Sequence, residues 1–171
     1  MHPLLLKLEG GDRRSIGRAD EVASEILKDP RLFHVLVEGL NVENPVIKMR
    51  AADAMEKASI EKPGHLLPYK SQLLKLAASS EQIEVQWHLA QILPRLKLNH
   101  NEKVTVVNTL LTYLSGNSSI VNTFVMQAFA DIAQTDEKLR PSLLVHIKEL
   151  SVTGTPAMKA RGRKLLAEFK G

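Results

Sequence analysis

One pattern recurs four times along the 171-residue chain and restricts its fold more than any other feature. The segments 46–58, 84–96, 120–132 and 157–169 align without gaps, at spacings of 36 to 38 residues. From the second residue of each segment, apolar or small residues recur four, seven, eight and eleven positions later. This spacing places them on one face of an α-helix, whereas a strand would alternate every second residue. In the first segment this apolar stripe consists of Ile47, Ala51, Ala54, Met55 and Ala58.

Shorter amphipathic stretches lie between these segments, and one more precedes them. Four are interleaved with the long segments, at 30–40, 65–78, 102–114 and 137–150. The additional stretch runs from Ser15 to Leu27. The pattern therefore predicts about nine helices, most of them in short–long pairs.

Polar residues stand where each long helix should begin. Asn44, Ser118 and Thr155 are residue types that cap helix N-termini well, whereas Gln82 at the equivalent position is a poor cap. Pro94 falls inside the second long segment, where a proline removes one backbone hydrogen bond. We therefore expect only this helix to be bent.

Helix pairs repeated at this period predict an α-solenoid, because one pair cannot bury its apolar face alone and stacked pairs can. The predicted fold is an all-α superhelix of about four helix pairs plus an N-terminal helix. We expect residues 1–171 to form a single domain of this kind.

The repeats resemble HEAT repeats, most clearly in the run from Ile47 to Met55, where an arginine follows an apolar position by three residues and small residues come next. Arg161 repeats the arginine of that run in the last segment, and His88 and Phe124 replace it in the middle two. The acidic residue that usually pairs with this arginine across HEAT repeats is absent. The resemblance, which covers residues 30–169, therefore implies the fold but only a neutral version of that ladder.

Composition and motifs predict no chemistry. The chain has no cysteine, and no long apolar run that could span a bilayer, so we expect a cytoplasmic protein. Nucleotide-binding, metalloprotease and serine-hydrolase motifs are missing. Glu84 and His88 stand one helical turn apart, but two ligands are weak evidence for metal. We predict no enzyme, no catalytic or metal-binding residue and no cofactor.

The leading functional hypothesis is a monomeric scaffold or adaptor that binds a protein partner on its concave face. A partner should dock on a ridge formed by Met49, Arg50, Trp87 and His88, which occupy neighbouring helical positions in adjacent repeats. Trp and Arg are enriched at binding hot spots, and Met at adaptable surfaces. In the alternative interpretation, Trp87 packs against the adjacent repeat instead.

Positive charge is concentrated near the end of the sequence. Residues 138–171 carry a net charge of +6, whereas the remaining residues carry −2. Lys159, Arg161 and Lys164 could bind an anion, which suits a second hypothesis of DNA binding related to the HEAT-like DNA glycosylases. The other interpretation is a polar terminal cap. Arg163 supports the cap, since the equivalent residues of the other segments are apolar.

Overall fold

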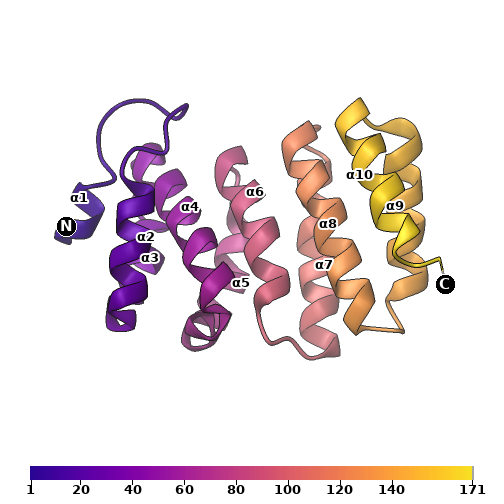
Figure 1. Cartoon of the computed structure of the whole chain (residues 1–171), viewed down its shortest axis with the longest axis horizontal. Helices are drawn as coiled ribbons and strands as arrows, with labels where there is room; N and C mark the ends of the chain where they lie inside the picture. The colour runs from indigo at the N-terminus through magenta and orange to yellow at the C-terminus, as the bar shows by residue number, and fades with distance from the viewer. Residues whose placement is uncertain (171) are drawn as a thin grey trace. The chain divides into compact units, whose positions relative to one another are not determined.

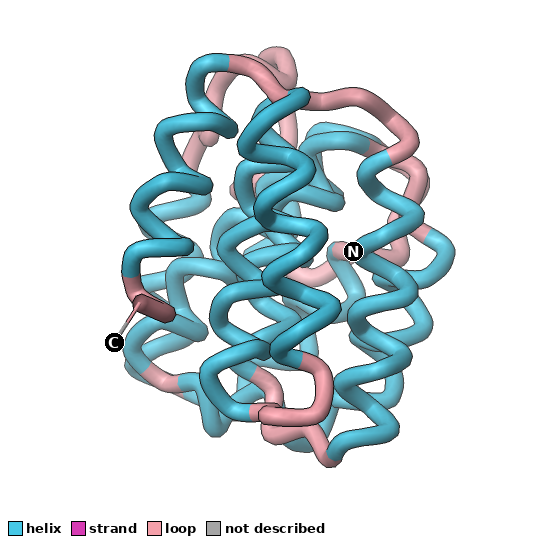
Figure 2. The backbone as a smooth tube through the Cα atoms, turned by 90° about the vertical axis from the view of Figure 1, so that its right-hand side faces the viewer, coloured by secondary structure: helices cyan, strands magenta, loops and turns pink. Residues whose placement is uncertain are grey.

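The computed structural model describes residues 1–170, and in that range helices and connecting loops make up the whole chain (Figure 2). No strand occurs in these residues, so the predicted all-α class is confirmed. Contacts divide the chain into two compact units, one of Met1–Leu96 and one that begins at Lys97. Within the described residues no helix is both long and apolar enough to cross a membrane.

The first unit has six α-helices and three short 3-10 helices among its residues. They are α1 (Pro3–Leu6), α2 (Ala19–Lys28), η1 (Pro30–Leu32), α3 (Phe33–Gly39), α4 (Pro45–Glu61), η2 (Pro63–Tyr69), α5 (Lys70–Ser79), α6 (Ile83–Ile92) and η3 (Leu93–Arg95). The long helix α4 packs between α2 and α6, and α3 packs on it as well (Figure 1). Helix α4 is therefore the centre of this unit.

The second unit repeats the short–long arrangement with four helices in its described part. They are α7 (His100–Leu114), α8 (Ser119–Thr135), α9 (Arg140–Thr153) and α10 (Pro156–Ala167). Helix α8 contacts α7, α9 and α10, and α9 contacts α10 (Figure 1). Helix α8 thus takes the central place in this unit that α4 takes in the first.

The helices lie where the periodicity predicts them, with some differences. The predicted stretches 30–40 and 65–78 begin as the 3-10 helices η1 and η2, and their α-helices start only at Phe33 and Lys70. The short helix α1 was not predicted, because four residues are too few to show a period. Pro94 does more than bend its helix: α6 ends at Ile92, and the next turn, Leu93–Arg95, continues as a 3-10 helix. The proline lacks the N–H that an α-helical turn would use, and the tighter turn accommodates it.

The predicted caps are confirmed, including the poor one. Side-chain oxygens of Asn44, Ser118 and Thr155 accept hydrogen bonds from backbone N–H groups in the first turns of α4, α8 and α10. Gln82 makes no such bond at the start of α6. Its amide instead donates to the carbonyl oxygen of Pro45 in the preceding pair, at 2.9 Å. In the second unit the hydroxyls of Ser119 and Thr155 are 2.7 Å apart. In each unit the starts of the two long helices are therefore joined by a neutral hydrogen bond.

The predicted apolar stripe forms the core of both units. Its members on α4, α6 with η3, and α8 are all buried, and so are the first three on α10. The last two, Leu166 and Phe169, are half-buried. Gly162 lies at the stripe position where α10 crosses α9, and a Cβ there would be 1.7 Å from the Ser151 hydroxyl oxygen. The close approach of these two helices therefore requires glycine.

We expect Leu93→Ala and Phe129→Ala each to lower the free energy of unfolding by about 2–5 kcal/mol, because both remove a large, fully buried side chain. Urea denaturation measures this change. Ile60→Ala and Val152→Ala are the controls, since these side chains are 61% and 74% exposed, and should change it by about 0.5 kcal/mol or less. A core variant that behaves like its control would show that the buried face is misassigned.

Candidate functional site

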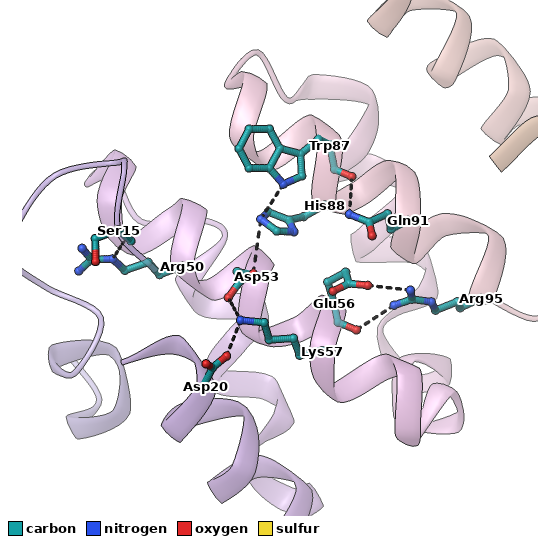
Figure 3. Close-up of polar contacts among 10 residues, drawn as sticks. All are labelled: Ser15, Asp20, Arg50, Asp53, Glu56, Lys57, Trp87, His88, Gln91 and Arg95. Atoms are coloured by element: carbon teal, nitrogen blue, oxygen red, sulfur yellow. Dashed lines mark hydrogen bonds and ion pairs between the residues drawn. The ribbon is translucent and has the colours of Figure 1, made fainter. Parts of the chain in front are cut away.

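The predicted docking ridge falls on α4 and α6 of the first unit, but most of it is inside the protein. Trp87 is half-buried, whereas Met49, Arg50 and His88 are 5%, 2% and 7% exposed. The prediction of a surface ridge is therefore wrong for these three residues. A helical wheel shows the positions of residues around one helix but not the other segments that cover them. Here a loop from the start of the chain closes over Arg50, and His88 faces Asp53 of α4 (Figure 3).

Arg50 is bound by main-chain carbonyl groups of the segment that precedes α2. Its three nitrogen atoms lie 2.7 to 3.2 Å from the carbonyl oxygens of Leu8, Glu9, Gly10, Asp12 and Ser15. A guanidinium stays charged in proteins and carries five N–H donors in a fixed fork. Five converging carbonyl dipoles supply the acceptors that such a buried charge needs. We call these five hydrogen bonds the Arg50 clamp, and residues 9–18 the clamped loop.

Gly17 shows how closely the clamped loop follows the guanidinium. Its φ is +55°, a left-handed conformation that favours glycine. A Cβ at this position would lie 2.7 Å from Cζ of Arg50. Gly17 therefore allows both the turn and the contact.

We expect Arg50→Met to accelerate trypsin cleavage after the exposed residues Arg13 and Arg14 of the clamped loop by about tenfold or more. Hydrogen bonds to charged groups contribute about 1.5–3 kcal/mol each, so their loss makes local opening easier. Lys57→Met, which removes another cation from α4, is the control and should leave the cleavage rate near that of the wild type. Mass spectrometry of the early fragments identifies the site, and unchanged cleavage in Arg50→Met would contradict the clamp.

A chain of polar contacts connects α2, α4 and α6 (Figure 3). The Lys57 ammonium contacts the carboxylate of Asp20 on α2 and lies 2.7 Å from Oδ2 of Asp53 on its own helix. Oδ1 of Asp53 is 3.8 Å from Nε2 of His88 on α6. The indole N–H of Trp87 donates to that same Nε2 at 2.9 Å. This series of polar contacts therefore ends at Trp87.

His88 is neutral in this series of contacts. Its Nε2 accepts from Trp87, which places the ring proton on Nδ1. Burial lowers the pKa of His88 to about 4, and the Lys57 charge acts in the same direction against the opposing effect of Asp53. The Nδ1 atom is itself buried and has no hydrogen-bond partner among the described residues. Near neutral pH the contact with Asp53 is therefore not an ion pair.

This lowered pKa makes stability depend on pH in a defined range. As the pH falls, the unfolded chain, with a histidine pKa near 6.5, binds a proton at a higher pH than the folded protein does. Stability that is complete above pH 6.5 should therefore fall between pH 6.5 and 4, by about 3 kcal/mol at most. We expect urea unfolding at pH 7 and pH 4.5 to show a smaller loss for His88→Gln than for the wild type. His34→Gln changes an exposed histidine and should keep the wild-type loss. Equal losses in all three proteins would contradict the assignment.

A second polar link joins the end of α4 to η3. Arg95 donates from Nη2 to Oε1 of Glu56 at 2.7 Å, and from Nη1 to the Glu56 carbonyl and the Ser59 hydroxyl, both at 2.8 Å. Glu56 and Ser59 are buried, so this link replaces water for both groups.

Within residues 1–170 no three His, Asp or Glu side chains are arranged to hold a metal ion. The Glu56–Arg95 link thus connects α4 to η3, whereas buried Arg50 holds the clamped loop.

Beside Trp87 the surface has a hollow of about 420 Å³. Its walls are Arg13 of the clamped loop and the residues around the start of α6, namely Glu81, Gln82, Ile83, Glu84 and Trp87. Ile83 is 46% exposed. Nε of Arg13 lies 3.6 Å from Oε1 of Glu84, whose side chain is only 18% exposed. An aromatic ring, an exposed aliphatic side chain and opposite charges therefore meet at one depression, which we call the Trp87 hollow.

Sequence reasoning missed most of this hollow. The three-residue spacing of Glu84 and Trp87 could have indicated one shared face of α6, whereas Glu81 precedes the helix. Arg13 comes from a loop nearly seventy positions earlier, and no sequence signal connects it to α6.

Comparison with models of protein families, with curated proteins and with solved structures finds no match for this chain. The function therefore has to be inferred from the residues themselves.

The predicted anion-binding residues lie on α10 of the second unit but do not converge. Arg161 is half-buried and donates from Nη1 to Oε1 of Gln127 on α8, at 2.7 Å. Lys159 and Lys164 are exposed, but five residues rotate a helix by about 140°, so they leave α10 on different sides. The three residues therefore do not form one site. Arg163, also exposed, is one turn from Lys159 and shares its face.

Proposed function

We propose that this chain is a HEAT-like α-solenoid that acts as a non-enzymatic scaffold and binds a protein partner along its concave face. Three observations support this proposal: the buried stripe repeats in every long helix, three of the four long helices have a side-chain cap at the equivalent position, and a neutral hydrogen bond joins the two long helices of each unit. Solenoids of this kind expose extended surfaces suited to binding. The row of α2, α4 and α6 would be the wall that meets the partner.

The observation that carries the proposal is the Trp87 hollow. Ile83 and Trp87 lie one turn apart in the first half of α6 and give the hollow apolar walls with charged groups beside them. Tryptophan is enriched among the residues that contribute most to protein–protein binding, and such residues usually sit in pockets. Single exposed aliphatic side chains are ordinary, but here one stands beside the only tryptophan of the chain.

The polar side chains of the first unit favour binding over catalysis. Asp53, Glu56, Arg50 and His88 are buried, and each contacts a neighbouring helix or loop. A catalytic acid or base must be within reach of a substrate as well as suitably titrated. These groups face other segments of the protein, so they are suited to holding helices together.

We expect Ile83→Asp to reduce capture of a protein partner about tenfold or more in affinity purification from native cells. A charge placed in an apolar contact leaves an ion that the partner must desolvate. Leu67→Asp is a matched control, because Leu67 is 48% exposed in the same unit, away from the hollow. Quantitative mass spectrometry after nuclease digestion measures the captured protein, and thermal unfolding checks that both variants fold. Equal capture by the two variants would contradict docking at the hollow.

DNA binding is a second candidate, supported by one observation. Lys159, Arg163 and Lys164 are exposed on α10, and no ion pair joins them to other residues in the described range. Such cations can contact phosphates without reading sequence. Arg50 and Arg95, in contrast, are used inside the first unit. Nuclease digestion in the same purification separates the two functions, since a DNA-mediated association would disappear.

A further inference from the structure

The Trp87 hollow has more negative than positive side chains along its walls. Two carboxylates, those of Glu81 and Glu84, line it together with one cation, that of Arg13. Glu81 is exposed, whereas the side chain of Glu84 is largely covered. A carboxylate that has lost much of its water gains most from a donor that approaches closely. The hollow therefore favours a cation near Glu84 and the Trp87 ring.

Arg13 fills this place only loosely. Its Nε lies 3.6 Å from Oε1 of Glu84, longer than the roughly 2.7–3.2 Å of a hydrogen bond. The Arg13 side chain is 55% exposed, and ion pairs of this kind contribute about 0–1 kcal/mol. A guanidinium that approached Glu84 edge-on could instead form two parallel hydrogen bonds. The present contact thus leaves much of the carboxylate's binding capacity unused.

The Arg50 clamp allows Arg13 to leave without unfolding its loop. Arg50 binds the carbonyl oxygens of Asp12 and Ser15, which flank Arg13 in the sequence, at 3.2 and 3.0 Å. The main chain is therefore fixed on both sides, while the side chain, among residues 1–170, has its contact with Glu84 to lose. Displacing Arg13 requires a change of side-chain rotamer, and exposed rotamers change rapidly.

We propose that the Trp87 hollow binds an arginine side chain of the partner protein, and that Arg13 occupies this place in the free protein. This inference rests on the proposed scaffold function and names the chemistry of the segment that would dock. A guanidinium fits better than an ammonium, because it stacks on an indole ring and binds a carboxylate with two hydrogen bonds. Ile83 supplies an apolar surface for the methylene groups of the incoming side chain.

Trp87 is the only tryptophan, so its fluorescence reports binding directly. The probes are three acetylated, amidated octapeptides in which glycine alternates with arginine, lysine or glutamate. We expect the arginine peptide to change the emission of Trp87 saturably and the lysine peptide to bind several-fold more weakly. The glutamate peptide should have no effect. Binding of the glutamate peptide, or equal binding of all three, would overturn the proposal.

Matched variants test the roles of the two charged residues. Glu84→Gln should weaken binding of the arginine peptide about tenfold or more, whereas Glu61→Gln, an exposed glutamate at the end of α4, should not. Arg13→Ala should tighten binding about threefold, since no internal competitor remains. Arg14→Ala changes the next residue of the same loop and should leave the affinity unchanged. Equal affinities of Arg13→Ala and Arg14→Ala would overturn the role assigned to Arg13.

The outcome also separates this inference from the scaffold function on which it rests. If Ile83→Asp abolishes capture of the partner but the arginine peptide leaves Trp87 unchanged, docking at the hollow stands and the arginine chemistry is wrong. If Ile83→Asp and Leu67→Asp capture the partner equally, docking at the hollow itself fails. Circular dichroism of each variant shows whether its helices are retained, so a loss of binding can be assigned to the hollow.

Discussion

Each long helix carries an apolar stripe that it cannot bury by itself, and the packing of both units follows from this constraint. In the first unit, α4 is covered by α2, α3 and α6, and in the second, α8 is covered by α7, α9 and α10. Where space is short, the stripe uses a small residue, as at Gly162 against Ser151. Burial of these stripes is the main favourable contribution to folding, and the position of every polar link depends on it.

Polar side chains then fix how neighbouring helices are aligned along their lengths. Lys57 contacts Asp20 in the preceding pair, and Arg95 binds Glu56 in the same way one pair later. In the second unit Arg161 reaches Gln127 of α8. Apolar contacts tolerate some sliding, whereas the largely covered Arg95–Glu56 pair must keep its partners, as charged groups inside a protein do. Within each unit these links therefore connect helices that lie far apart in the sequence.

The sequence predicted local structure better than it predicted the candidate site, and the reason is physical. Helix positions, caps and the stripe depend on residues a few positions apart, which a period reveals. Burial of Arg50 depends on the loop around Gly17, and the hollow depends on Arg13, both distant in the sequence. A helical wheel therefore placed Arg50 on a surface that a different segment covers. The family resemblance likewise indicated a repeated arginine but not the carbonyl groups that bind it here.

The Arg50 clamp binds main-chain oxygens, which every residue type provides. The clamp restricts the residue type only where the backbone passes close to the guanidinium, as at Gly17. The exposed side chains of Arg13 and Arg14 can therefore vary during evolution while the loop keeps its path, whereas the Asp12 carboxylate accepts a hydrogen bond from the Arg14 backbone N–H at 2.9 Å. The same set of helices could in this way present loop surfaces of different size and charge through changes in a few residues, without any change to the helices that carry its stability.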